Sequence, residues 1–353
     1  MVRAIKVTLQ DGEKIRRILQ KNGWYNNRFL VKKEEGVIYF PVVPDLDIRK
    51  NKIKGKKEGL DWELVDVELE KHEDKMNTSA IEQALAFILT VKERELLPRS
   101  YDVIGDILVL ELPDELQKKE KKIAEAYLAT HKQVKTVVKK ARAHGGVYRT
   151  RGIEILLGEK RKETVHRESG LRLKIHLEKV YFSPRSVGER LRIARQVKKG
   201  EEVLVMFCGA APFCCVIAKH SPAKQVVGIE INPAGHRYGE ENVQLNKLQG
   251  RVKLYCGDVR KVLPRLKKNF DRIVMPLPKT SSEFLPLTLK YVKKGGIIHY
   301  YCFLEDGLIE TEGFTTIKEI CMKEKKKCRI LRWCASGQQA PRIWRVCFDV
   351  KIL

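Results

Sequence analysis

The sequence lacks the cysteine pairs that hold most structural zinc ions. Its nine cysteines all lie between Cys208 and Cys347, and none forms a C-x-x-C pair with another. The N-terminus has no apolar signal core, so we expect a cytoplasmic protein with reduced, mostly buried thiols. A disulfide between Cys328 and Cys334 is the one pairing left open. No apolar run approaches the length of a membrane span, so neither a membrane partner nor a metal site is expected.

Acidic residues are few relative to basic ones. The 353 residues include 70 Lys and Arg against 45 Asp and Glu, which gives a formal net charge of +25. Such an excess attracts polyanions through counterion release, so nucleic acid is the first candidate partner. A basic protein without such a partner is the alternative. The length predicts two or three domains.

Residues 1–62 are predicted to form a small N-terminal domain followed by a basic linker. The stretch "RAIKVTL" alternates as a strand does, and "GEKIRRILQKNG" has the periodicity of a helix. "FLVKKEEGVIYFPVV" predicts a hairpin that turns near Gly36, which completes a βαββ unit. The basic stretch over residues 45–62 is a flexible linker, a phosphate-contacting tether, or both.

Residues 63–180 mix helices and strands without strict alternation, which predicts an α+β RNA-binding domain. We expect one helix over residues 80–94, capped by Ser79, and an amphipathic helix over residues 114–131. Strands are expected around a turn at Gly105, in "VKTVVKKA", in "GVYRTRGIEILLGE" and in the hairpin "ETVHRESGLRLKIHLEKV".

Residues 181–353 alternate between short apolar strands and helical segments. The strands are "EEVLVMF", "QVVGIEI", "VKLYCGD", "FDRIVMPL" and "GGIIHYYCF". This pattern predicts a doubly wound, Rossmann-like α/β sheet, which binds ligands beyond the carboxyl ends of its strands. Two C-terminal strands are expected to run antiparallel at one edge.

The turn after the first of these strands contains one glycine where dinucleotide sites have three. It reads Gly209-Ala210-Ala211-Pro212-Phe213, so it suits a nucleotide without phosphate, such as S-adenosyl-L-methionine. Glu230 and Asp258 end the next two strands, where one acid can accept both ribose hydroxyls and the other can reach the adenine amino group. A helix cap and a turn residue are the alternative roles. Their placement at consecutive strand ends favours an adenosyl site.

The most distinctive segment is "VYFSPRSVGERLRI", which precedes that strand. Together with "MFCGAAPF", "GIEINP", "GDVRKVL" and "MPLPK", it resembles the tRNA guanine-37 N1-methyltransferases of archaea and eukaryotes. "PRSYDVIGDILVLELP" resembles the middle domain of that family, and the βαββ unit resembles its small first domain, which contacts the outer corner of tRNA. The resemblance implies a class I methyltransferase domain that methylates N1 of guanosine 37 in tRNA. We expect a monomer.

The resemblance also implies roles for individual residues. Glu189 matches the general base, and Arg149 matches the arginine that faces guanine O6, with Arg151 as second choice. Pro278 matches the loop that lines the methyl group. The other positions matching cofactor contacts or flanking the site are Tyr181, Arg185, Phe207, Glu230, Asn232, Pro233 and Asp258.

The chemistry explains why such groups are needed. Guanine N1 carries a proton, which a carboxylate within hydrogen-bond reach can remove as the methyl bond forms. A guanidinium can then stabilise charge on O6. The base must also leave its stack, and Tyr181 can hold it once extruded. The alternatives are a first-turn acid favoured by the helix dipole for Glu189 and a solvated basic strand around Arg149.

Three positions depart from the family pattern. Val205 stands where an acid is common, Ala211 replaces a second glycine, and Pro276 replaces an asparagine. Two other hypotheses therefore stay open: aminocarboxypropyl transfer from S-adenosylmethionine to a wyosine precursor in tRNA, and a non-catalytic RNA-binding relative. The retained "MPLPK", Arg185 and Glu189 favour methyl transfer.

Overall fold

The computed structural model describes residues 2–22, 24–26, 29–34, 36–43, 46, 62–70, 80–97, 100–141, 148 and 152–353. The chain divides into two compact units, Met1–Ala84 and Leu85–Leu353. No helix among the described residues is long and apolar enough to cross a membrane. Most of the basic stretch at residues 45–62, together with Ser79, Arg149 and Arg151, lies outside the described residues.

The N-terminal unit is built on a four-stranded sheet with the order β2-β3-β1-β4. Its elements are β1 (Val2–Thr8), α1 (Gly12–Lys21), β2 (Lys32–Glu34), β3 (Val37–Pro41) and β4 (Trp62–Val67). The predicted βαββ order is confirmed, and the hairpin turns at Gly36, whose φ of 78° lies in the left-handed region. β4 pairs with β1, so the sheet continues past the predicted boundary at residue 62.

The second unit opens with a mixed sheet in the order β5-β6-β7-β8 and a separate hairpin of β9 and β10. Only β6 and β7 pair in parallel, which confirms the α+β prediction. The elements are α2 (Ala80–Ala86), which begins in the N-terminal unit, α3 (Val91–Glu95), β5 (Asp102–Ile104), β6 (Ile107–Leu110), η1 (Asp114–Lys119), α4 (Glu120–Thr130), β7 (Thr136–Lys140), β8 (Ile153–Gly158), β9 (Glu163–Glu168) and β10 (Leu171–His176).

The single helix expected over residues 80–94 is wrong. Two helices, α2 and α3, occupy this stretch because Thr90 starts a new one. Its side chain accepts a hydrogen bond from the amide of Glu93, and the Glu93 carboxylate accepts from the amide of Thr90. This reciprocal capping box gives the second helix its own N-terminus.

The rest of the unit is a seven-stranded sheet in the order β13-β12-β11-β14-β15-β17-β16. β11 to β15 run parallel, and β17 runs antiparallel to both of its neighbours. This confirms the doubly wound prediction. The elements are η2 (Pro184–Ser186), α5 (Val187–Ala194), β11 (Glu202–Met206), α6 (Pro212–His220), β12 (Gln225–Glu230), α7 (Pro233–Leu245), β13 (Val252–Cys256), α8 (Val259–Leu266), β14 (Phe270–Met275), α9 (Ser281–Tyr291), β15 (Val292–Glu305), α10 (Ile309–Lys323), β16 (Cys328–Ala340) and β17 (Ile343–Ile352).

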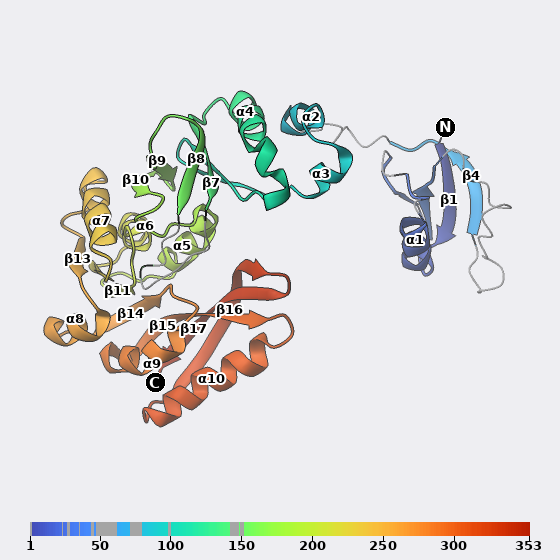
Figure 1. Ribbon diagram of the computed structural model, residues 1–353. Helices are drawn as coiled ribbons and strands as arrows, with labels where there is room; N and C mark the ends of the chain where they lie inside the picture. The colour runs from blue at the N-terminus through green and yellow to red at the C-terminus, as the bar shows by residue number, and fades with distance from the viewer. Residues whose placement is uncertain are drawn as a thin grey trace. The chain divides into compact units, whose positions relative to one another are not determined.

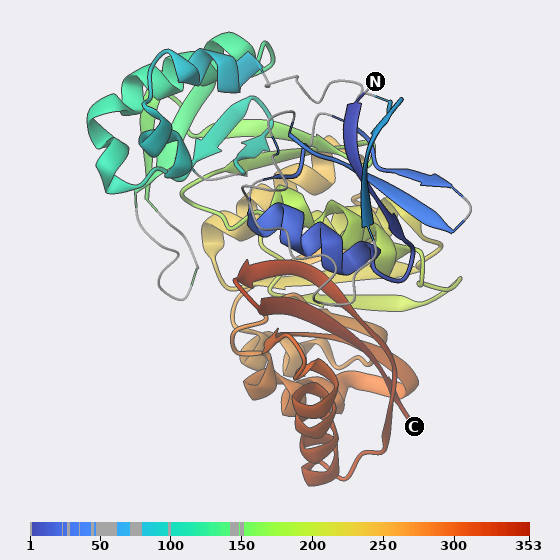
Figure 2. The same cartoon turned by 90° about the vertical axis from the view of Figure 1, so that its right-hand side faces the viewer.

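Helices cover both faces of this sheet. α5, α6 and α7 lie on one face, and α9 and α10 lie on the other (Figure 1). The alternation along β11 divides the core accordingly: Val203 and Val205 pack on the first face, and Leu204 and Met206 pack on the second. Figure 2 shows the long strands β16 and β17 running together beside α10. The order reverses between β11 and β14, which is where such sheets bind ligands.

All nine cysteines are free thiols, so the disulfide between Cys328 and Cys334 is wrong. Both residues lie on the extended strand β16, where six residues span about 20 Å. Disulfides need Cα atoms roughly 4–7 Å apart. Cys334 instead faces Cys347 across the β16–β17 ladder.

Candidate active site

In the turn between β11 and α6, every second residue has a left-handed backbone conformation. Phe207, Gly209 and Ala211 have φ angles of 57°, 57° and 63°. Glycine adopts this conformation freely, whereas each L-residue with a side chain pays about 1–2 kcal/mol for it. Ala211 therefore keeps the backbone shape that a glycine would have, with strain. Strained turns of this kind concentrate at ligand sites.

Glu230 at the end of β12 holds this turn in place. Its Oε2 accepts a hydrogen bond of 2.6 Å from the amide of Gly209, and its Oε1 accepts one of 2.8 Å from the amide of Asn232. Burial raises the pKa of Glu230, although these backbone donors oppose the rise. A carboxylate has about four acceptor positions. Glu230 can thus fix the turn and still accept bonds from ribose hydroxyls.

Asn232 ties the distinctive segment before α5 to the same turn. Its Oδ1 caps α7 by accepting from the amide of Ala234, and its Nδ2 donates to the carbonyl of Lys179 at 2.7 Å. A Cβ on Gly209 would lie 3.5 Å from the carbonyl oxygen of Tyr181, so this backbone passes beside the turn. The Tyr181 residue is 41% exposed there. Each end of the Asn232 amide therefore makes one bond to a protein group, and its contact with the cofactor stays a prediction.

Asp258 begins a row of side chains beyond the strand ends. It caps α8 by accepting from the amide of Arg260, and it pairs with the Arg260 guanidinium at 2.6 Å, which lowers the pKa of Asp258. That guanidinium lies 5.6 Å from the ring centroid of Phe284. Phe284 in turn meets Phe207 edge-on, with centroids 4.8 Å apart. Arg260 and Phe284 are not among the predicted site residues; for Arg260 the available signal was an arginine two residues after a strand-end acid.

Arg185 binds residues that lie before and in β5. Its Nε donates to Asp102 at 2.7 Å and its Nη2 to Ser100 at 3.3 Å, so it joins the segment before α5 to the start of β5. Val205 is fully buried in the apolar core on the α5 face. Pro276 and Pro278 lie in the loop after β14, where the intervening Leu277 amide donates to the carbonyl of Met275.

Glu189 lies in the first turn of α5, as predicted, and its side chain is 7% exposed. Arg192 binds both carboxylate oxygens, at 2.6 Å through Nε and at 2.8 Å through Nη2. The hydroxyl of Tyr301 donates to Oε1 at 2.5 Å. Glu189 is thus a buried first-turn acid with two side-chain partners, and its role as the base stays a prediction.

A chain of buried polar side chains continues from Arg192 down the same face of the sheet. Arg192 donates to Asp349 at 2.8 Å, and the Nδ1 of His299 lies 2.6 Å from Asp349. The Nε2 of His299 lies 2.8 Å from Arg272, which also pairs with Glu201. An arginine is always a donor, so the neutral imidazole accepts at Nε2 and donates from Nδ1 to Asp349.

The same region contains three residues of metal-ligand type, but it does not suit a cation. His299, Cys347 and Asp349 present ligand atoms within 4.8 Å of one another. However, Asp349 already pairs with Arg192 and Arg332, and His299 contacts Arg272. Three guanidinium groups around the cluster would repel a metal ion.

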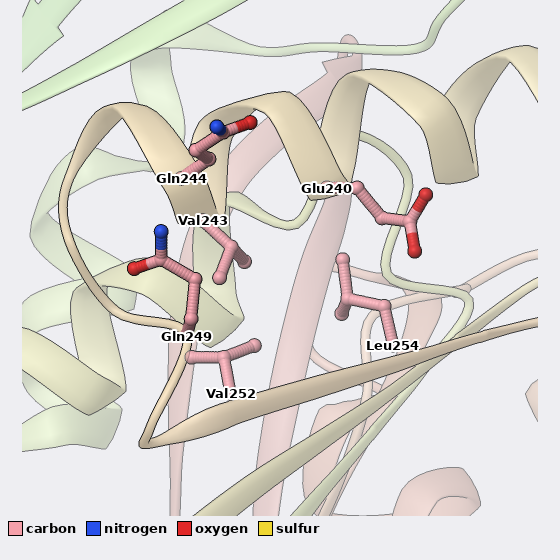
Figure 3. A pocket seen from close by; sticks show the side chains of 6 residues that line it. All are labelled: Glu240, Val243, Gln244, Gln249, Val252 and Leu254. Carbon is pink, nitrogen blue, oxygen red and sulfur yellow. The ribbon is translucent and has the colours of Figure 1, made fainter.

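Two hollows in the second unit have other linings. The first, about 340 Å³, is lined by three residues of α7, by Val252 and Leu254 of β13, and by Gln249 (Figure 3). The second, about 630 Å³, is lined by Val103, Gly105, Asp106, Arg161 and residues 163–167. Neither is lined by Glu189, Glu230 or Asp258.

The doubly wound sheet, the turn with one glycine and the buried acid after β12 define a nucleotide-binding enzyme of the class I methyltransferase type. The TRM5/TYW2 methyltransferase domain matches residues 164–331, the TYW2 N-terminal domain matches 81–161, and the tRNA methyltransferase 5 N-terminal domain matches 4–50. The chain belongs to the TRM5/TYW2 family.

Two curated relatives match over nearly the whole chain. The tRNA (guanine(37)-N(1))-methyltransferase Trm5b of Pyrococcus abyssi is 36% identical, covering 100% of this chain and 99% of its own length. Its namesake from Methanocaldococcus jannaschii is 35% identical, covering 99% and 98%. The tRNA(Phe) (4-demethylwyosine(37)-C(7)) aminocarboxypropyltransferase of Pyrococcus horikoshii is 35% identical, covering 78% of this chain and 99% of its own.

Solved structures agree. The crystal structure of P. abyssi Trm5b superposes with a TM-score of 0.70 at 35% identity, covering 100% of this chain and 99% of that one. The complex of aTrm5 with tRNALeu superposes with a TM-score of 0.69 at 32% identity, covering 99% of each chain.

Proposed function

We propose that this protein transfers a methyl group from S-adenosyl-L-methionine to N1 of guanosine 37 in tRNA. One observation favours methyl transfer over aminocarboxypropyl transfer within the family. The match to both Trm5b methyltransferases spans the chain from end to end and includes the N-terminal domain at residues 4–50. The P. horikoshii aminocarboxypropyltransferase matches 99% of its own length but only 78% of this chain.

The strand ends provide the groups that an adenosyl ligand needs. Glu230 is a buried carboxylate with free acceptor positions for ribose hydroxyls, and Phe207 and Phe284 offer aromatic surface. Asp258 lies at the next strand end, near the place where an adenine amino group would donate. When bound, the cofactor supplies an electrophilic methyl carbon on a sulfonium sulfur. Pro278 is proposed to line the methyl position.

Glu189 is proposed as the general base. Its carboxylate takes the N1 proton of guanine while N1 forms its bond to the methyl carbon; the carbon–sulfur bond breaks and its electron pair stays on sulfur. Charge that develops on O6 needs a donor, and Arg149, outside the described residues, is the proposed guanidinium. The exposed ring of Tyr181 offers a stacking surface for the extruded base.

The net charge favours tRNA as the substrate, and the free thiols favour a reducing compartment. The net charge of +25 suits a large polyanion. All nine thiols are free, as expected for the cytoplasm. We propose that the protein acts there as a monomer.

A second candidate is aminocarboxypropyl transfer to a wyosine precursor. The match of residues 81–161 to the TYW2 N-terminal domain and the P. horikoshii relative favour it. Both reactions consume the same cofactor but move different carbons of it.

The test uses two forms of labelled cofactor, one labelled in the methyl group and one in the carboxyl carbon. Each is incubated with an unmodified tRNA transcript that has guanosine at position 37, with a transcript that has adenosine there, and with tRNA carrying the wyosine precursor. The proposal predicts methyl label on N1 of guanosine 37 and none on the adenosine transcript. Carboxyl label on the precursor alone would establish the second candidate. Label in neither arm would mark a non-catalytic RNA-binding protein.

A further inference from the structure

Side-chain donors hold both oxygens of the Glu189 carboxylate. Oε1 accepts from Tyr301 and from Nη2 of Arg192, and Oε2 accepts from Nε of Arg192. The thiol of Cys334 lies 3.8 Å from Oε2. A glutamate held in this way cannot rotate about its carboxyl bond without breaking a charge-assisted hydrogen bond.

Arg192 is itself held from the sheet. Its Nη1 donates to Asp349 at 2.8 Å, and its Nη2 lies 3.1 Å from the sulfur of Cys347. Asp349 is 1% exposed and is gripped in turn by His299 and Arg332. The helix that carries Glu189 is therefore clamped to β15, β16 and β17, the strands at one end of the sheet. In a network this buried, removing one partner leaves others unsatisfied.

We propose that Tyr301, Arg192 and Asp349 are positioning residues that hold Glu189 in its proton-accepting orientation, an inference that rests on the proposed role of Glu189 as the base. A general base works only when its lone pair meets the substrate proton within hydrogen-bond reach. Preorganisation of that lone pair requires locked rotamers and supporting hydrogen bonds.

Charged and titratable groups face Glu189 from each of the elements packed against it. They come from α5 (Arg192), β15 (Tyr301 and, through Asp349, His299), β16 (Cys334 and, through Asp349, Arg332) and β17 (Cys347 and Asp349).

The chain offers a matched pair of tyrosines for the test. Tyr300 and Tyr301 are neighbours on β15, both 2% exposed, but they face opposite cores. Single-turnover methyl transfer is measured for Tyr301→Phe and Tyr300→Phe, with cofactor affinity measured by calorimetry. Tyr301→Phe should be slower by about tenfold or more, the worth of one hydrogen bond to a charged group. Its affinity for S-adenosylmethionine should stay within a few fold of the parent, so that the loss falls on the transfer step. Tyr300→Phe should keep the parental rate.

Asp349→Asn tests the next contact in the network. It removes the charge that holds Arg192, so the methyl-transfer rate should fall while the cofactor affinity stays within a few fold of the parent. If Asp349→Asn fails to fold, the tyrosine pair decides alone. The same rate in Tyr301→Phe and Tyr300→Phe would overturn the inference. If Glu189→Gln reacts at the parental rate, the assignment of Glu189 as the base fails. This result does not depend on the outcome for either tyrosine variant.

Discussion

The Nδ1 atom of His299 on β15 lies 2.6 Å from Oδ1 of Asp349 on β17, inside the sheet core. Burial lowers the pKa of His299, and the hydrogen bond to Asp349 opposes this only in part. Burial alone would raise the pKa of Asp349, but its hydrogen bonds outweigh that effect and hold its pKa well below the usual range. The hydrogen bond from His299 is the largest of these lowering effects, and those from Arg192 and Arg332 follow.

This pair predicts acid sensitivity in two stages. Below about pH 6.5 the unfolded chain protonates this histidine and the folded protein does not, so stability falls by up to about 1.4 kcal/mol per pH unit from His299. Below about pH 4 the depressed Asp349 adds a further loss, because the unfolded aspartate takes a proton first. Urea unfolding between pH 7.5 and about 2.5 checks both stages, with His299→Gln as the control that lacks the first stage. Equal slopes in parent and variant between pH 6.5 and 5 would contradict it.

Glu230 is predicted to bind the adenosyl ribose. Glu230→Gln keeps the size and the Oε acceptor but removes the charge, so the Kd for S-adenosylmethionine should rise roughly ten- to hundredfold. The affinity for tRNA should change little. Calorimetry provides the measurement, and Glu240→Gln, an exposed acid on α7, is the control. Unchanged cofactor affinity in Glu230→Gln would confine Glu230 to holding the turn.

Gly228 lets β12 approach α6 closely. A Cβ there would lie 2.6 Å from Leu254 Cδ2, 2.8 Å from Cys214 Sγ and 2.9 Å from Cys208 Sγ. Gly228→Ala should therefore destabilise the protein by about 1–3 kcal/mol through overpacking. Gly250→Ala meets nothing within 4 Å and is the control. Denaturant unfolding of both variants checks this, and equal stability would show that the core can absorb the methyl group.

The N-terminal unit is predicted to recognise tRNA shape and to take no part in the chemistry. Deletion of residues 1–79 removes its whole sheet, including β4. The apparent KM for full-length tRNA should rise about tenfold or more, as phosphate contacts are lost. An anticodon stem-loop should react equally well with both forms. Loss of cofactor binding in the shortened protein would instead place this unit in the catalytic core.

Much of the fold was predictable because its signals are local. The apolar strands of residues 202–305 are short and regularly spaced, so their ends, and with them Glu230 and Asp258, could be placed from the sequence. The capping box of Thr90 and Glu93 is also visible in the sequence as a Thr-x-x-Glu pattern. The helical periodicity continues across it, so the sequence predicted one helix instead of two.

The partners of Glu189 could not be predicted, because sheet topology creates them. Tyr301 lies 112 positions further along the chain, and Asp349 reaches Arg192 across 157 positions. Nothing in "HYYCF" or "CFDVKIL" identifies a charged partner until β15 and β17 pair in register. The same holds for β4, whose pairing with β1 spans the basic stretch.

The central claim is that Glu189 removes the N1 proton of guanosine 37. Glu189→Gln keeps size and hydrogen bonding but loses basicity, and single-turnover kinetics across pH, with product release excluded, measures the methyl-transfer step itself. The account predicts a fall of about 10²–10⁴-fold, the loss of the parental rise in rate with pH, and cofactor and tRNA affinities within a few fold of the parent. A variant that reacts at the parental rate, or that is slow only because it fails to bind tRNA, would contradict it.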